Sequence, residues 1–177
     1  MAGNHLLKVI STPFSVPWRA DPLDAKPSIL FVCRANICRS PMAEGIARQW
    51  LKERNLHRKW VVDSAGTHAG GREKTDARAQ RVCIEKGVNL KRLRSRPITE
   101  KDFEKFDMIL AMDAEVLEDL RKAAPDGALE KLAMLSNEAV DEGKPGVPDP
   151  YFGSVQGFYR VYDILQGSVT RLLQAHE

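Results

Sequence analysis

The chain has 177 residues, 43% of them hydrophobic and 29% charged, with a formal net charge of +3 at pH 7. This length suits one domain with a substantial core, and the small charge gives no support for a nucleic-acid partner. No stretch approaches the roughly 18 to 20 apolar residues of a membrane span, and the N-terminus lacks the apolar core of a secretory signal. Three cysteines do not make a disulfide framework. We therefore expect a cytoplasmic protein that does not bind membranes.

Residues 1–27 differ in composition from the rest of the chain. They contain four of the ten prolines and show neither helical nor strand periodicity. Their apolar residues are too many for a purely solvated tail. We expect an N-terminal extension at 1–27, part of which lies against a single domain at 28–177.

From Ser28 onward, short apolar runs alternate with amphipathic segments. The pattern predicts strands at 28–32, 59–66, 107–113 and 130–135, and helices at 40–55, 75–88, 99–106, 114–125 and 155–174. A turn-rich loop is expected at 136–154. Strands that alternate with helices predict a doubly wound α/β fold. We expect a four-stranded parallel sheet flanked by helices, with the flavodoxin-like strand order 2-1-3-4.

The loop from Cys33 to Arg39 has residue types that suit anion binding. Ligands of open α/β sheets bind beyond the carboxyl ends of the strands, where a helix N-terminus offers free N–H groups and a positive dipole end. Arg39 adds a planar donor fork for two phosphate oxygens, and the amides of 34–39 can hold the rest. These groups favour the thiolate of Cys33. The loop therefore predicts a phosphate site with a cysteine nucleophile.

Three other side chains have predicted tasks around this phosphate. Ser40 can donate its hydroxyl to the thiolate, and it is also a candidate cap for the following helix. Asn36 is expected to bond backbone groups and hold the loop in its curved shape. Cleavage of a phosphate ester also needs a proton donor for the leaving oxygen. The best candidate is Asp149 in "PDPYFG", although Asp-Pro by itself more often marks a turn.

"VCRANICRSP" followed far downstream by "DPYFG" resembles the low-molecular-weight protein-tyrosine phosphatases. "DSAGT" (63–67), "ITEKDFEKFDMILAMD" (98–113) and the closing helix are also similar to that family, so the likeness covers about residues 28–175. It implies a phosphocysteine mechanism with no metal or other cofactor. In it Cys33 attacks, Arg39 binds the phosphoryl group, and Asp149 protonates the phenolate before activating the hydrolytic water.

The resemblance also implies a substrate site and a redox partner. The substrate-binding residues would be Arg34, Ala35, Asn36, Ile37, Cys38, Ser40, Tyr151 and Phe152. Cys38 resembles the partner that forms a reversible disulfide with Cys33 under oxidants. A role as a small buried packing residue is equally compatible with Cys38.

The chain departs from the family pattern at three places. Ala35 stands where the family usually has Gly, so this position loses easy access to positive φ or accepts strain. After Thr67 the family commonly has an aromatic residue at the pocket rim and one further residue before a Gly. This chain is one residue shorter there and has Gly70 at that place. We expect a more open leaving-group pocket, unless another aromatic residue, such as Trp18, fills the space. Leu93 replaces a His that supports the loop Asn, so Asn36 must find another partner.

Three alternative functions fit this sequence less well. A phosphoarginine phosphatase tends to have Thr at the position of Ile37, whose apolar side chain suits an aromatic ring. A thiol-dependent arsenate reductase needs two further cysteines close together, whereas Cys83 stands alone outside the loop. A non-catalytic phosphotyrosine-binding module would be expected to have lost Cys33, Arg39 or Asp149. The favoured function is a protein-tyrosine phosphatase acting on phosphotyrosine proteins, for which a tyrosine autokinase is one candidate partner.

Overall fold

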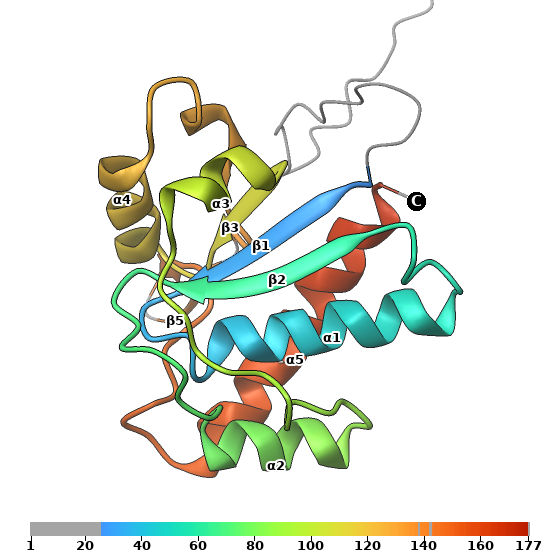
Figure 1. Cartoon of the computed structure of the whole chain (residues 1–177). Coiled ribbons are helices and arrows are strands. Elements are labelled where there is room, and N and C mark those ends of the chain that lie inside the picture. Colours follow the sequence, from blue (N-terminus) through green and yellow to red (C-terminus); the bar gives the residue numbers. More distant parts are fainter. Residues whose placement is uncertain (1–25, 138, 142, 177) are drawn as a thin grey trace, which may run out of the picture.

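The structure is a computed structural model that describes residues 26–137, 139–141 and 143–176; the extension predicted at 1–27 therefore falls almost wholly outside the described residues. Figure 1 shows the elements in chain order. The strands are β1 (Ser28–Cys33), β2 (Val61–Gly66), β3 (Met108–Ala111), β4 (Leu132–Met134), β5 (Ala139–Asp141) and β6 (Lys144–Pro145). The helices are α1 (Arg39–Glu53), α2 (Ala77–Glu85), α3 (Glu100–Lys105), α4 (Ala114–Ala123) and α5 (Val155–Gln174).

The main sheet has four parallel strands in the order β2-β1-β3-β4, as predicted. Strand β1 is buried along its whole length because both faces of the sheet are covered. Its side chains alternate between two apolar clusters: Ile29 and Phe31 belong to one, Leu30 and Val32 to the other. The prediction of a buried strand from the continuous apolar run at 28–32 is therefore confirmed.

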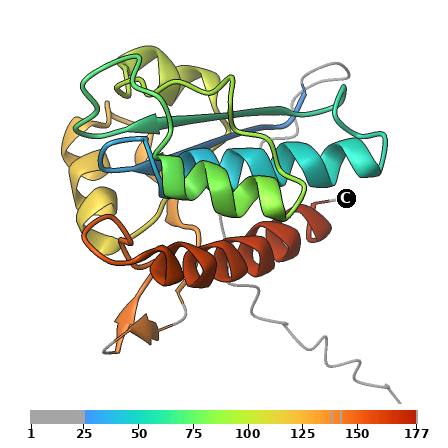
Figure 2. The same ribbon diagram turned by 90° about the horizontal axis from the view of Figure 1, so that it is seen from below.

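Helices cover the two faces of this sheet unequally (Figures 1 and 2). The long helices α1 and α5 pack side by side on one face, with α2 beside them, and α3 and α4 lie on the other. Helix α5 begins and ends where the sequence pattern predicted. Within the described residues, no helix combines the length and the apolar character that a membrane span requires.

Most predicted elements have ends that differ by one to three residues from the structure, and two parts of the pattern differ further. The strand predicted at 130–135 is shorter, because residues Leu129–Lys131 form a 3₁₀ turn that delivers the chain to β4. The loop predicted at 136–154 contains the small antiparallel pair β5–β6. Strands of three and two residues are too short to show the alternation that identifies a strand in sequence.

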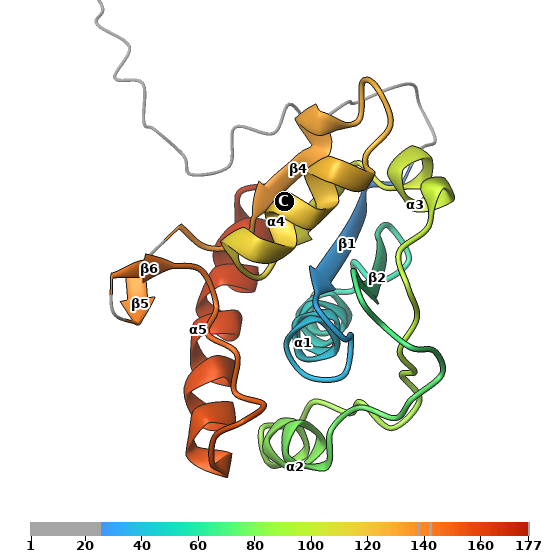
Figure 3. The same ribbon diagram turned by 90° about the vertical axis from the view of Figure 1, so that its left-hand side faces the viewer.

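The carboxyl ends of the parallel strands converge at one edge of the sheet (Figure 3). The loop after β1, the segment after β2 and the start of α4 after β3 all lie at this edge. The segment between β6 and α5 returns to the same edge, since Val147 N–H donates to the carbonyl of Met112 at 2.7 Å. This edge therefore gathers the chemistry-bearing residues that the sequence analysis selected.

Candidate active site

Cys33 is the last residue of β1, and its sulfur lies at the centre of a hydrogen-bonded loop. The side chain is 3% exposed. Its Sγ accepts the backbone N–H of Asn36 at 3.2 Å and lies 3.0 Å from the Oγ of Ser40. The sulfur opens into a cavity of about 280 Å³. The cavity is lined by Cys33, Arg34, Ala35, Ile37, Cys38, Arg39, Asp149, Tyr151 and Phe152.

Asn36 holds the curvature of this loop. Its φ is +55°, in the left-handed region that Asn tolerates better than most residues, whereas Ala35 has no positive φ and carries no such strain. The Asn36 Oδ1 accepts the backbone N–H of Arg96 at 2.9 Å. Its Nδ2 donates to the hydroxyls of Ser40 (2.8 Å) and Ser64 (2.9 Å). The predicted bond to backbone is present, and the partner required by Leu93 in place of His is Ser64.

The direction of these bonds determines what Ser40 can do. A backbone N–H can only donate, so the Asn36 atom facing Arg96 is the oxygen and the atom facing Ser40 is the NH₂ group. The Ser40 oxygen is thus an acceptor from Asn36, and its own hydrogen is available to Cys33 Sγ at 3.0 Å or to the carbonyl of Ala65 at 3.3 Å. Ser40 can therefore donate to the sulfur, in agreement with the first of its predicted tasks.

The second task predicted for Ser40, capping the helix, is wrong. Helix α1 begins at Arg39, and its N-cap residue is Cys38, which makes no side-chain capping bond. Ser40 lies one residue inside the helix, where its side chain points back toward the sulfur. The first turn of α1 contains no acidic residue, so its positive dipole end stays free to stabilise an anion.

A buried carboxyl group extends this network and was not predicted. The Ser64 hydroxyl donates a hydrogen bond to the Oε2 of Glu44 at 2.6 Å. The Glu44 side chain is 3% exposed, and its Oε1 lies 2.6 Å from Nη2 of Arg48. Burial raises the pKa of Glu44, against the opposing effects of Ser64 and Arg48. The available signal was spacing, because Glu44 follows Ser40 by four residues and therefore shares its helix face.

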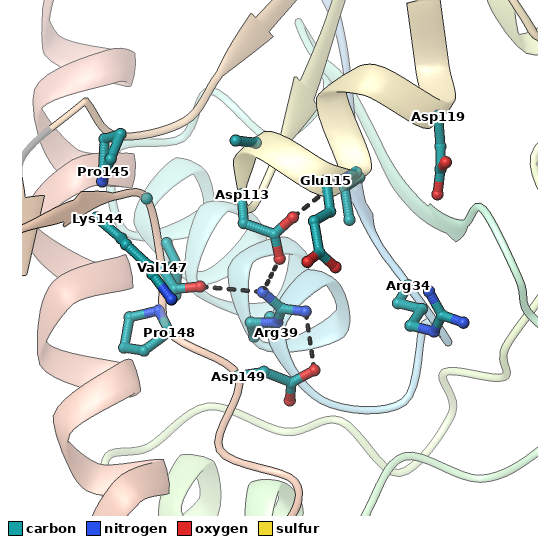
Figure 4. A pocket seen from close by; sticks show the side chains of 13 residues that line it. Arg34, Arg39, Asp113, Glu115, Asp119, Lys144, Pro145, Val147, Pro148 and Asp149 are labelled. Atoms are coloured by element: carbon teal, nitrogen blue, oxygen red, sulfur yellow. Dashed lines mark hydrogen bonds and ion pairs between the residues drawn. The ribbon is translucent and has the colours of Figure 1, made fainter. Parts of the chain in front are cut away.

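Arg39 projects from the first turn of α1 into a ring of acceptors (Figure 4). Its Nη1 donates to Asp113 and, at 3.0 Å, to the carbonyl of Val147, and its Nη2 donates to Asp149 at 3.0 Å. The Arg39 side chain is buried. Burial opposes its charge, but the negative groups of Cys33, Asp149 and Asp113 prevail and raise the pKa of Arg39. These acceptors use three of the five N–H donors of the guanidinium, which leaves two donors for an anion.

Asp113 has a structural role at the start of α4 and a second contact with Arg39. It is the N-cap of α4, where its Oδ1 accepts the N–H of Val116 at 2.8 Å. Its other oxygen accepts from Arg39. A single carboxylate thus orients both a helix and the arginine of the phosphate loop.

Asp149 lies at the same sheet edge as Cys33 and Arg39, although more than one hundred residues separate them in sequence. Its Oδ2 pairs with Arg39, and its Oδ1 accepts the backbone N–H of Tyr151 at 3.1 Å. The side chain remains 46% exposed, so it can exchange protons with solvent or a ligand.

Tyr151 and Phe152 form the outer wall of the cavity. Their rings meet edge to face, with centroids 5.0 Å apart, and both side chains are exposed. Gly70 is not among the residues that line this cavity, so the more open pocket stays a prediction. Trp18, the candidate replacement, lies outside the described residues.

A second cavity, of about 670 Å³, also borders Arg39 (Figure 4). It is bounded by the start of α4 and by the segment that follows β6. Arg34, Arg39 and Asp149 border both cavities, so the two spaces adjoin at the phosphate loop.

The three cysteines are free and buried in the structure. Burial, with the nearby charges of Asp76 and Cys33, raises the pKa of Cys38. Burial raises the pKa of Cys83 to about 12, and its side chain belongs to the buried core. The reversible disulfide between Cys33 and Cys38 stays a prediction.

Comparisons with known proteins agree in both sequence and structure. A family model described as low molecular weight phosphotyrosine protein phosphatase matches residues 28–177. The low molecular weight protein-tyrosine-phosphatase of Streptomyces coelicolor is 37% identical over 153 residues, which cover 83% of this chain and 92% of the relative. The low molecular weight phosphotyrosine protein phosphatase of Homo sapiens is 37% identical over 142 residues, 78% of this chain and 88% of the relative.

Solved structures match over a similar span. A protein tyrosine phosphatase from Entamoeba histolytica, with Hepes in its active site, has a TM-score of 0.77 and 34% identity, covering 84% of this chain and 95% of the other. A Cys-to-Ser mutant of the arginine phosphatase YwlE, with a phosphorylated active-site serine, has a TM-score of 0.75 and 29% identity. It covers 84% of this chain and 94% of the other.

Proposed function

The chain belongs to the low molecular weight phosphotyrosine protein phosphatase family, and we propose that it hydrolyses phosphotyrosine in proteins by using Cys33 as its nucleophile. The observation that carries this assignment is the convergence on one buried sulfur of the Asn36 N–H and the Ser40 hydroxyl. Two donors aimed at Sγ favour a thiolate over a thiol. A thiolate is the form of cysteine that attacks phosphorus.

In the first step, Cys33 Sγ forms a bond to phosphorus while the bond from phosphorus to the phenolic oxygen breaks. Arg39 and the free N-terminus of α1 hold the phosphoryl oxygens and stabilise the charge that builds on them. Asp149, in its protonated form, gives its proton to the departing phenolate. The product alcohol is tyrosine, and the phosphoryl group stays on Cys33.

In the second step, Asp149 acts in the reverse sense. As a carboxylate it takes a proton from a water molecule, whose oxygen attacks phosphorus and displaces Cys33 as a thiolate. The Ser40 hydroxyl, positioned to donate to Sγ, stabilises that departing thiolate. Inorganic phosphate is released, and the enzyme returns to its starting state without a metal ion.

The walls of the 280 Å³ cavity support an aromatic substrate. Ile37 and Tyr151 both line the cavity with apolar surface, and the exposed ring of Phe152 extends this lining. The backbone of the loop from Arg34 to Cys38 would bind the phosphate oxygens. Because YwlE is an arginine phosphatase of similar fold, phosphoarginine is the competing substrate, and the apolar side chain of Ile37 favours phosphotyrosine over it.

The physiological setting follows from the substrate. We place the protein in the cytoplasm, where thiols remain reduced, with a phosphotyrosine protein as its partner and a tyrosine autokinase as one candidate. Neither nucleic acid nor a membrane has a part in the proposed reaction.

A panel of matched phosphopeptides tests this proposal. Peptides of one sequence carrying phosphotyrosine, phosphoserine or phosphoarginine are assayed for phosphate release with the wild type, Cys33→Ser and Cys83→Ser. Turnover restricted to phosphotyrosine, lost in Cys33→Ser and kept in Cys83→Ser, is the expected result. Preference for phosphoarginine would replace the proposed substrate, and turnover by Cys33→Ser would overturn the mechanism.

A further inference from the structure

Arg78, in the first turn of α2, contacts the segment that carries Asp149. Its Nη1 donates to the carbonyl of Gly153 at 2.9 Å, and its Nη2 donates to the carbonyl of Tyr151 at 2.9 Å. The N-terminal end of α2 lies beside this segment (Figure 1). Within the described residues, Gly153 N–H bonds Pro150 O in a local turn. Arg78 thus donates from another element to two main-chain carbonyls of the segment 149–153.

The same guanidinium is fixed to the phosphate loop through Asp76. Arg78 donates from Nε (3.1 Å) and Nη2 (2.8 Å) to the two oxygens of the Asp76 carboxylate. The backbone N–H of Asp76 donates in turn to the carbonyl of Ile37, in the loop around Cys33, at 2.8 Å. The hydrogen bonds from Arg78 lower the pKa of Asp76, so the pair is charged at neutral pH.

Packing also restrains the guanidinium. It lies over the ring of Phe158, 4.5 Å from the centroid, and near the ring of Tyr151 at 5.7 Å. Phe158 is fully buried in α5. A planar group that makes four hydrogen bonds and lies over a ring cannot be replaced by the single ammonium of a lysine.

We propose that Arg78 is a positioning residue that holds the acid-bearing segment in register with the phosphate loop. The connection runs from Ile37 through Asp76 and Arg78 to Tyr151, whose N–H bonds the Oδ1 of Asp149. Arg78 touches no reacting atom in this scheme. It fixes the distance between the sulfur that attacks and the carboxyl group that protonates the leaving oxygen.

This inference rests on the proposed acid role of Asp149 and adds a consequence to it. A misplacement of about 1 Å can reduce a rate by about a hundredfold. Loss of Arg78 should therefore slow substrates whose leaving group needs a proton and spare those whose leaving group does not. A merely structural role would slow all substrates alike.

The test measures kcat/KM for a series of aryl phosphates of graded leaving-group acidity, from phenyl phosphate to p-nitrophenyl phosphate. The variants are Arg78→Met, which keeps an unbranched apolar side chain, and Asp149→Asn as the reference for a lost acid. Arg81→Met is the matched control. Arg81 is on the same helix, is exposed and pairs with Glu85. Inhibition by inorganic phosphate reports on the phosphate loop.

Arg78→Met is expected to lose roughly tenfold or more with phenyl phosphate and about twofold at most with p-nitrophenyl phosphate. The dependence of its kcat/KM on leaving-group acidity should become steeper and approach that of Asp149→Asn. Inhibition of Arg78→Met by inorganic phosphate, and the kcat/KM of Arg81→Met, should both stay within about twofold of the wild-type values. If Arg78→Met does not fold, Arg78→Lys should show a smaller steepening with near-normal thermal stability.

A parallel loss across the series in the Arg78 variants, beside a steepened dependence in Asp149→Asn, would overturn the positioning role alone. A wild-type dependence in Asp149→Asn would overturn the acid role of Asp149 and this inference with it.

Discussion

Arg39 and Asp149 form an ion pair, with Nη2 of the arginine 3.0 Å from Oδ2 of the aspartate. The two groups have opposite tasks in the proposed reaction, since one binds the phosphoryl dianion and the other delivers a proton. While they are paired, the carboxylate occupies one of the guanidinium donors that could bind phosphate. We expect a bound phosphate ester to compete with Asp149 for Arg39, so that binding frees the carboxyl group to face the leaving oxygen.

Replacing Asp149 by Asn should separate these two effects. Loss of the proton donor is expected to reduce kcat for phosphotyrosine by about 10²- to 10⁴-fold. Loss of the competing charge should tighten inhibition by inorganic phosphate, by up to about fivefold, since exposed ion pairs are worth up to about 1 kcal/mol. Steady-state kinetics with phosphate as inhibitor measure both. Weaker inhibition in Asp149→Asn would show that the pair does not compete with the substrate.

Asp113→Asn should impair catalysis through Arg39. The amide keeps an oxygen for the N–H of Val116 and so preserves the cap of α4, but it removes the charge that holds the guanidinium. We expect kcat/KM to fall roughly tenfold or more because the arginine is misplaced, with little change in thermal stability.

The control for Asp113 is Asp107→Asn. Asp107 is a carboxylate beside Ser28, at the opposite end of the sheet. It should leave kcat/KM near the wild-type value. Equal kinetic effects of the two variants would indicate a general disturbance of the sheet rather than an action on Arg39.

The elements that bind the phosphate could be predicted from sequence because their signals are local. One continuous stretch of sequence contains a buried strand, a short loop with Cys33 and Arg39, and the start of a helix. The doubly wound fold class followed from the alternation of strands with helices. The position of Asp149 at the same edge followed from the rule that loops after parallel strands share that edge.

The contacts that tie distant segments together could not be predicted. Asn36 reaches Arg96 and Ser64, and Arg39 reaches Asp113, through bonds that depend on how whole elements pack. Serine is a common cap, which is why the sequence predicts the N-cap of α1 at Ser40. In the structure the Ser40 hydroxyl instead lies beside the Cys33 sulfur, to which it can donate a hydrogen bond. At such positions the hydrogen bonds of the site, rather than local capping preference, determine where the side chain points.

Substitutions of Asn36 should separate its backbone role from its side-chain role. Asn36→Ala loses both the tolerance for φ of +55° and the hydrogen bonds of the amide, and should lower the free energy of unfolding by about 2 kcal/mol or more. Asn36→Gly should recover about 1 kcal/mol of this, because glycine accepts positive φ freely.

Neither variant of Asn36 should recover activity, because both release Ser40 and the loop. Denaturant unfolding and kcat/KM for an aryl phosphate provide the two readouts. Wild-type activity in Asn36→Gly would mean that only the backbone conformation matters.

Alkylation should distinguish the three cysteines. Burial raises the pKa of Cys38 and that of Cys83, so both thiols stay protonated and slow to react at neutral pH. Iodoacetate, an anion, should therefore modify Cys33 first at pH 7, and inorganic phosphate should protect it. Modification of Cys38 should increase only in strongly alkaline solution. Peptide mass spectrometry locates the adduct, and first labelling at Cys38 or Cys83 would count against a stabilised thiolate at Cys33.

The most direct test of the central claim is to trap the phosphoryl group on the protein. Asp149→Ala is mixed with a phosphotyrosine peptide and quenched within the first turnover in alkaline denaturant, in which the phosphorus–sulfur bond is stable, and the intact protein and its peptides are weighed by mass spectrometry. The account predicts one added phosphoryl group, located on Cys33, with tyrosine peptide released in equal amount. Release of the dephosphorylated peptide with no adduct, or with the adduct on another residue, would contradict it.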